Sequence, residues 1–208
     1  MMARQVKDGH YQFGRYMSRG RWMSVWHQVS ELLALDPKAV LEVGPGPGVL
    51  KSVINGFGCR LETLDIDEAL CPDYLASAEE MPFNNGSFDV VCAFQVLEHM
   101  PFDVSLSVLR EMWRVCSGGV VISLPDARPC WSSSVRIPYV RPLNIMFERP
   151  FFRGDVHVFD GEHYWEINKK GYALSDVSSL LLNCVPGAAM STYRVRENPY
   201  HRFFVFKK

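Results

Sequence analysis

The sequence predicts an α/β fold in which a parallel sheet is covered by helices on both faces. Short apolar segments typical of buried strands alternate with segments of helical periodicity between residues 39 and 125. A glycine-rich turn follows the first of these strands and leads directly into a helix, which is the first half of a strand–helix–strand unit. A length of 208 residues suits one well-packed domain, so we expect a single domain.

The first expected elements are a helix and a buried strand. The helix is expected to stop at Asp36-Pro37. Its apolar residues follow helical spacing; they are Trp22, Val25, Trp26, Val29, Leu32 and Leu33. The run Ala39–Val43 is expected to be the strand, and Val49–Ile54 the start of the next helix. Residues 59–67 alternate in polarity as a second strand, and Phe88–Phe94 is a continuous apolar third strand.

The next helix is expected to begin with Asp103 as its N-cap and to end before Gly118-Gly119, with a strand over 120–124. A helix near Leu174–Asn183 and two late strands near 188–195 and 202–207 complete the chain. We therefore divide the domain into an N-terminal helical segment (1–36), a cofactor-binding core (37–125), an irregular insertion (126–167) and a C-terminal helix with strands (168–208).

Composition limits the classes of partner. The formal net charge of −1 gives no overall attraction to nucleic acid or anionic membranes, so we expect no nucleic-acid partner. No apolar run reaches the roughly 20 residues of a membrane span, and the N-terminal residues do not resemble a signal peptide. The six cysteines form no CxxC pair, which favours reduced core thiols over disulfides or zinc. These features lead us to expect a cytoplasmic protein.

The glycine-rich turn has the wrong chemistry for a pyrophosphate. Its sequence is Gly44-Pro45-Gly46-Pro47-Gly48, and the two prolines remove two of the N–H donors that a phosphate site would use. Glu42 precedes the turn, and its carboxylate would repel a phosphate and attract a cation. The turn therefore predicts a ligand that carries a positive group.

The segment "VLEVGPGPG" resembles the first motif of the class I S-adenosylmethionine-dependent methyltransferases, most closely the small-molecule type with the "LEH" signature at Leu97–His99. The resemblance implies a Rossmann-like, mostly parallel seven-stranded sheet with a late antiparallel strand, and S-adenosyl-L-methionine as the cofactor. It also implies that Glu42 meets the methionine ammonium, and that Gly44, Gly46 and Gly48 let the backbone pass close to the cofactor.

Further cofactor contacts follow from the same resemblance. Asp65, at the end of the second strand, would bind both ribose hydroxyls, with Asp67 as the neighbouring alternative, and Ile66 would lie against the adenine. In "SAEEMPF", Ser77 replaces an expected aspartate, which leaves the Ala78 backbone and Glu79 as contacts to the adenine edge. Phe94 and Gln95 would lie beside the methionine portion.

Methyl transfer from a sulfonium is an in-line displacement, so the main task of the enzyme is to position the acceptor. A base is needed only if the acceptor must lose a proton, and His163 and His99 are the candidates because imidazole titrates near neutral pH. Some RNA-end methyltransferases bind a divalent ion through an ExxEH motif and a later histidine. Here Gln95 replaces the first carboxylate, so we expect no metal site.

The insertion is the natural cap over the acceptor. It contains eight aromatic residues and five arginines, which are Arg128, Arg136, Arg141, Arg149 and Arg153. These residue types would suit a small-molecule acceptor that is anionic and glycan- or lipid-linked. An apolar cap with its arginines in solvent or at a homodimer interface is the simpler interpretation, and both stay open.

Three alternatives to an active small-molecule enzyme stay open. They are a non-catalytic cofactor-binding partner subunit, a protein or RNA methyltransferase, and a nicotinamide dehydrogenase.

Overall fold

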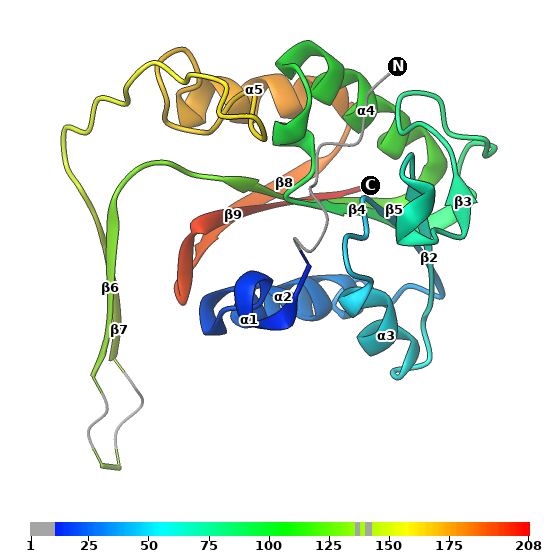
Figure 1. Ribbon diagram of the computed structural model, residues 1–208, viewed down its shortest axis with the longest axis horizontal. Helices are drawn as coiled ribbons and strands as arrows, with labels where there is room; N and C mark the ends of the chain where they lie inside the picture. The colour runs from blue at the N-terminus through cyan, green and yellow to red at the C-terminus, as the bar shows by residue number, and fades with distance from the viewer. Residues whose placement is uncertain (1–10, 136–137, 140–142) are drawn as a thin grey trace.

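The computed structural model describes residues 11–135, 138–139 and 143–208. Its main sheet has seven strands in the order β3-β2-β1-β4-β5-β9-β8 (Figure 1). Neighbouring strands are parallel from β3 to β5, and β9 is antiparallel to both β5 and β8. The strands are β1 (Ala39–Val43), β2 (Arg60–Asp65), β3 (Tyr74–Leu75), β4 (Phe88–Phe94), β5 (Cys116–Pro125), β8 (Ala189–Val195) and β9 (Asn198–Lys207). The prediction of a mostly parallel sheet with a late antiparallel strand is confirmed.

The helices lie on the two faces of this sheet. Figure 1 shows α2 and α3 on one face and α4 and α5 on the other. The helices are α1 (Phe13–Tyr16), α2 (Arg19–Leu33), α3 (Val49–Asn55), α4 (Phe102–Val115) and α5 (Leu174–Cys184), with single 3₁₀ turns η1 (Glu68–Leu70) and η2 (Leu97–His99). No helix in the described ranges is long and apolar enough to cross a membrane.

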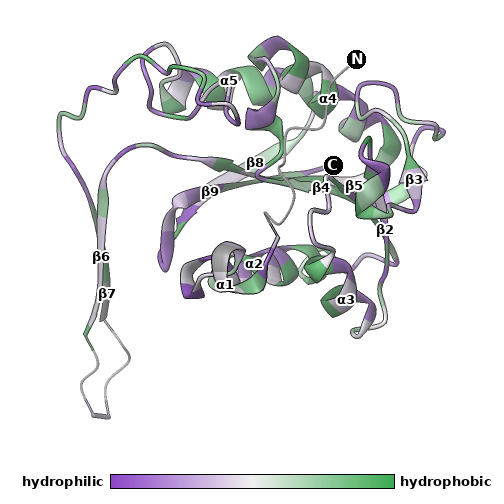
Figure 2. Cartoon of the chain, viewed as in Figure 1, coloured by the Kyte–Doolittle hydropathy of each residue, from purple (hydrophilic) through white to green (hydrophobic). Residues whose placement is uncertain are grey.

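Each face of the sheet has its own apolar core because strand side chains alternate in direction. Leu41 and Val43 of β1 pack into the core that includes α4 and α5, whereas Val40 packs into the core that includes α3. Figure 2 shows apolar and polar residues mixed along every long helix, and the buried members, such as Leu109 of α4 and Leu181 of α5, belong to these cores.

Three local predictions are wrong. Trp22 and Trp26 of α2 are 50% and 58% exposed, so they do not share the buried face with Val25 and Leu32. Helix α4 begins one residue before Asp103, with Pro101 as its N-cap, and ends at Val115. Gly118 and Gly119 lie within β5, which begins at Cys116, instead of ending the helix. A Cβ on Gly119 would stand 2.5 Å from the Phe206 carbonyl oxygen, so glycine allows strand β9 to pair closely there.

The insertion is more regular than predicted. Strands β6 (Cys130–Val135) and β7 (Leu143–Glu148) pair as an antiparallel hairpin that extends away from the main sheet (Figure 1). The hairpin side chains from 131 to 135 are exposed on both faces, so burial imposes no alternation of polarity on the sequence. Arg136 and Arg141 lie outside the described residues.

A buried ion cluster joins the base of this hairpin to β8 and β9. Asp126 accepts a hydrogen bond from Arg202 Nε at 2.7 Å, and its carboxylate lies 3.6 Å from Arg194 Nε. Glu148 of β7 pairs with both arginines and with Arg128 at 3.3 Å. Arg128 is one of the arginines expected to face an anionic acceptor. Its guanidinium is instead paired with the Glu148 carboxylate of the same chain.

Candidate functional site

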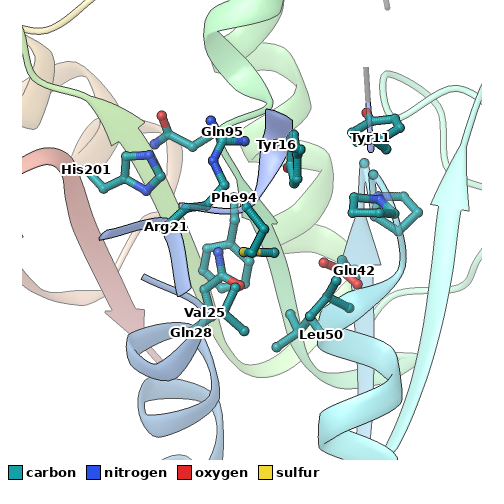
Figure 3. A pocket seen from close by; sticks show the side chains of 16 residues that line it. Tyr11, Tyr16, Arg21, Val25, Gln28, Glu42, Leu50, Phe94, Gln95 and His201 are labelled. Atoms are coloured by element: carbon teal, nitrogen blue, oxygen red, sulfur yellow. The ribbon is translucent and has the colours of Figure 1, made fainter. Parts of the chain in front are cut away.

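The main pocket opens at the carboxyl ends of β1 and β4, where the strand order of the parallel sheet reverses. This switch point is where open α/β sheets bind their ligands. The pocket holds about 630 Å³ of space between atoms, part of it open to solvent. Its walls come from α1, α2, the glycine turn, the end of β4 and β9; they are Tyr11, Tyr16, Met17, Arg21, Val25, Gln28, Glu42, Gly44, Pro45, Gly46, Pro47, Val49, Leu50, Phe94, Gln95 and His201 (Figure 3).

Glu42 is the acidic group at the floor of this pocket. It lies in β1, it is buried, and its Oε2 has no hydrogen-bond partner within the described part of the chain. Burial raises the pKa of Glu42 to about 8, and the positive charge of Lys51 opposes this rise only partly. A buried carboxylate without a partner is costly, so the site is suited to a ligand that brings a positive group to it.

The glycine turn wraps closely around the end of β1. Gly44, Gly46 and Gly48 all have positive φ angles, of 69°, 52° and 71°. A Cβ on Gly44 would stand 2.6 Å from Val96 Cγ2, whereas a Cβ on Gly48 would meet nothing within 4 Å. Gly46 lies against the ring of Tyr11, which is 3.4 Å from the position of a Cβ. The turn therefore needs glycine for its backbone and, at Gly44, also for space.

The residues predicted to hold the adenosine lie at the end of β2 and after β3, and none of them is among the walls of the main pocket. Asp65 accepts a hydrogen bond from the Asp67 backbone N–H at 2.8 Å, which orients its carboxylate. Burial raises the pKa of Asp65 although its backbone hydrogen bonds oppose the rise. Ile66 is 46% exposed, which suits a residue that covers a ligand rather than a core residue. Ala78 is half-buried and Glu79 is exposed.

Several wall residues escape prediction from the sequence. Tyr16, Arg21 and Gln28 come from α1 and α2, and His201 comes from β9, far along the chain. Arg21 lies over the Tyr16 ring at 4.1 Å. Burial, with the nearby Arg21 charge, lowers the pKa of His201 to about 3, so this imidazole is neutral. The helical spacing of apolar residues over 22–33 predicts only the apolar face of α2. It does not predict which polar residues of α2, such as Arg21 and Gln28, line the pocket.

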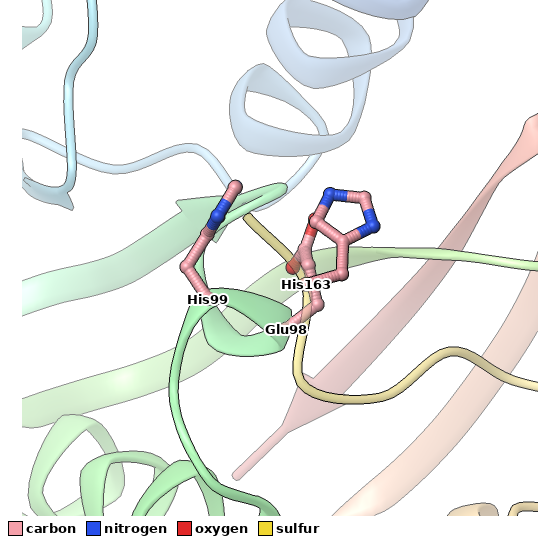
Figure 4. A group of neighbouring side chains, drawn as sticks. All are labelled: Glu98, His99 and His163. Atoms are coloured by element: carbon pink, nitrogen blue, oxygen red, sulfur yellow. The ribbon is translucent and has the colours of Figure 1, made fainter. Parts of the chain in front are cut away.

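His99 and His163 come together in a second group of side chains, with Glu98 (Figure 4). The two imidazole rings meet edge to face with centroids 4.9 Å apart. Neither ring lines the main pocket, but Gln95, which does, lies three residues before Glu98. Glu98 is fully buried, and neither of its carboxylate oxygens has a hydrogen-bond partner among the described residues.

Further hydrogen bonds orient His99 and His163. His99 Nδ1 lies 2.9 Å from the Glu162 carbonyl oxygen, and His163 Nδ1 lies 2.9 Å from Glu166 Oε1. The Tyr200 hydroxyl also donates to Glu166 Oε1, at 2.6 Å. Burial opposes ionisation of Glu166, but the hydrogen bonds from His163 and Tyr200 prevail and lower its pKa.

Known proteins match both the sequence and the fold. Residues 41–124, from β1 to the end of β5, match the family model described as "Methyltransferase domain". This segment contains the glycine turn, the second-strand acid and the LEH run in the order described above. Over residues 41–124 the chain matches the methyltransferase family. The predicted family is thus confirmed for this part of the chain.

Curated relatives match a little under half of this chain. A ubiquinone biosynthesis O-methyltransferase of Pseudomonas paraeruginosa is 32% identical over 109 residues, and the Pseudomonas aeruginosa (strain UCBPP-PA14) protein of the same name is 31% identical. The matched region covers 44% of this chain and 45% of each relative. The chain therefore spans about half the length of the curated relatives that it matches.

Solved methyltransferases share the fold over most of the chain. The 1,6-didemethyltoxoflavin-N1-methyltransferase of Burkholderia thailandensis, with bound S-adenosylhomocysteine, has a TM-score of 0.61 and 16% identity over 96% of this chain and 84% of that one. The magnesium protoporphyrin IX methyltransferase of Synechocystis PCC 6803 also has a TM-score of 0.61, covering 99% of this chain and 88% of that one at 16% identity. At these identities the likeness establishes the fold.

Proposed function

We propose that this protein transfers a methyl group from S-adenosyl-L-methionine to a small-molecule acceptor. The observation that carries the proposal is the buried Glu42 carboxylate, which faces the switch-point pocket with one oxygen unpartnered among the described residues. A methionine ammonium is a cation of suitable size for this carboxylate, and the prolines of the turn disfavour a pyrophosphate in the same place.

The cofactor lies across the ends of β1, β2 and β4 in this proposal. Glu42 binds the methionine ammonium, and Arg21 on the opposite wall supplies a positive charge for the methionine carboxylate. Gly44, Gly46 and Gly48 let the backbone approach the cofactor, while Phe94 and Gln95 lie beside the methionine portion. Asp65 binds the ribose hydroxyls, Ile66 covers the adenine, and Ala78 with Glu79 lies at its edge.

The acceptor is proposed to be a small molecule that approaches from the side of His99 and His163. Either histidine would serve as the base for an acceptor that must lose a proton. The names of the curated relatives favour a hydroxyl acceptor, because those proteins are O-methyltransferases. An anionic acceptor, glycan- or lipid-linked, has reduced support, since Arg128 is paired with Glu148 and only the exposed Arg149 and Arg153 remain within the described insertion.

Cofactor binding is expected to release a proton. With its pKa at about 8, the Glu42 carboxyl is mostly protonated at pH 7, and it must ionise to bind an ammonium. Calorimetry in buffers of different ionisation enthalpy should show release of about 0.9 proton per S-adenosylhomocysteine at pH 7, falling toward zero above about pH 9. Affinity should therefore rise with pH and level off above about pH 9. Glu42→Gln should bind more weakly and release no proton; unchanged proton release would assign the linkage to another group.

Turnover distinguishes an enzyme from a cofactor-binding subunit. The purified chain is incubated with S-adenosyl-L-methionine and a panel of phenols, catechols, amines and glycan phosphates, and S-adenosylhomocysteine is measured by mass spectrometry. We expect acceptor-dependent formation of S-adenosylhomocysteine that Glu42→Gln reduces at least about tenfold, in line with the loss of one charge-assisted contact. Tight cofactor binding without turnover on small molecules or a cell extract would support the non-catalytic alternative.

A further inference from the structure

The group formed by Glu98, His99 and His163 has the composition of a metal site. One ligand atom from each of the three side chains lies within 4.8 Å of the others. Ligands that share one ion at about 2.1 Å stand roughly 3–3.5 Å apart, so adjustments of about 1 Å would bring all three onto the same ion. The three come from η2 and from the loop before α5, which the fold brings together (Figure 4).

The burial of the Glu98 carboxylate is a second, independent observation that favours a cation at this group of side chains. Its side chain is 0% exposed, and neither carboxylate oxygen has a hydrogen-bond partner within the described ranges. Burial of such a carboxyl without a partner costs several kcal/mol unless a cation or proton compensates. A bound cation would satisfy both oxygens at once, which a single proton would not.

The hydrogen bonds of the two histidines fix their ring nitrogens as metal sites require. The Glu162 carbonyl can only accept, so His99 carries its proton on Nδ1 and presents a lone pair on Nε2 when neutral. The Glu166 carboxylate likewise accepts a hydrogen bond from His163 Nδ1, which leaves the lone pair of His163 on Nε2. The Tyr200 hydroxyl donates to the same Glu166 carboxylate and fixes its position. A histidine that donates its second N–H to a carbonyl or carboxylate is the usual arrangement around protein-bound metals.

We propose that Glu98, His99 and His163 bind one divalent first-row transition-metal ion, such as Co²⁺, Zn²⁺ or Fe²⁺. Two imidazoles and one carboxylate favour such ions over Mg²⁺ or Ca²⁺, which prefer oxygen ligands. Three protein ligands also leave at least one position for water or for an acceptor oxygen. This inference revises the expectation of no metal, which rested on Gln95, a residue outside the three-membered group. A histidine that binds metal through Nε2 cannot accept a proton there, so the site is an alternative to a histidine base.

The direct test is Co²⁺ binding by the chelator-stripped full chain, measured by calorimetry and by the visible d–d spectrum without cofactor or acceptor. We expect about one tight Co²⁺ per chain and a rise in melting temperature on binding. Glu98→Gln should weaken binding about 100-fold or more, and it should fold because Glu98 makes no side-chain hydrogen bond among the described residues that the change would break. The exposed Glu80→Gln serves as the matched control and should bind as the unmodified chain does.

A second variant separates ligation from packing. Glu166→Gln leaves all three ligands in place and should weaken Co²⁺ binding roughly 10- to 100-fold, because it removes the carboxylate that orients His163. The proposal is overturned if Co²⁺ at millimolar concentration does not bind, if Glu98→Gln binds it as tightly as the unmodified chain, or if Mg²⁺ binds in preference to Co²⁺. Binding that persists in Glu98→Gln with a thiolate absorption band would place the ion on a cysteine such as the exposed Cys71. Because the assay needs no methyl transfer, its failure leaves the proposed function untouched.

Discussion

Asp65→Ala is expected to weaken S-adenosylhomocysteine binding about 100-fold or more while the fold is retained. Each hydrogen bond from a hydroxyl to a carboxylate is worth roughly 1.5–3 kcal/mol, and the proposed ribose contact contains two of them. Asp65 is the last residue of β2, and its carboxylate is held by the Asp67 backbone N–H rather than by a core contact. Calorimetric titration of the variant measures the loss, and its circular dichroism reports whether the sheet persists.

Asp67→Ala is the matched control for this prediction. Asp67 lies two residues further on, and its side chain caps η1 by accepting from Ala69 N–H at 3.0 Å. Its loss should cost about 1 kcal/mol of local stability and change affinity much less than loss of Asp65. If the two variants bind equally, or if Asp67→Ala is the weaker binder, the ribose contact belongs to Asp67 or elsewhere.

Gly44→Ala is expected to lower the free energy of unfolding by about 2–5 kcal/mol and to abolish cofactor binding at micromolar concentration. The positive φ angle alone costs an alanine roughly 1–2 kcal/mol, and the contact with Val96 adds about 1–3 kcal/mol of overpacking. Chemical denaturation of the apo chain measures the first effect, and titration with S-adenosylhomocysteine measures the second.

Gly48→Ala separates the two causes, because its φ angle of 71° matches that of Gly44 while the space around it is open. This variant should lose only about 1–2 kcal/mol. Adding Val96→Ala to Gly44→Ala should recover part of the stability, since it removes the two methyl groups nearest to the new Cβ. If Gly44→Ala and Gly48→Ala lower the free energy of unfolding equally, the contact between the new Cβ and Val96 does not contribute to the loss of stability.

The core of this fold could be predicted from its sequence because β1 and β4 are short apolar strands, β2 alternates in polarity, and strong turn signals separate them. The predicted strand Phe88–Phe94 and the helix starting at Val49 match the structure at these positions. The hairpin β6–β7 could not be predicted, since neither of its faces is buried and its sequence carries no alternation. The predicted apolar face of α2 wrongly included Trp22 and Trp26, which are exposed. Hydrophobicity in the sequence does not reveal which apolar side chains are buried in the fold.

The candidate site was predictable only where one motif contains all of its parts. Glu42 and the three glycines lie within seven residues, so their proximity follows from local sequence. His201 and Arg21 reach the same pocket from opposite ends of the chain, which no local pattern reveals. The approach of His163 to Glu98 likewise depends on how the insertion folds back. That contact changes the chemistry available to both histidines, because a buried carboxylate now stands beside them.

The buried acid and the proline-interrupted glycine turn should select a cation-bearing adenosyl amino acid over a dinucleotide. This selection is measured by calorimetry with S-adenosylhomocysteine and with NAD, on the same preparation at pH 8. We expect micromolar affinity for S-adenosylhomocysteine and no measurable binding of NAD at millimolar concentration. Binding of NAD with no response to S-adenosylhomocysteine would contradict the account.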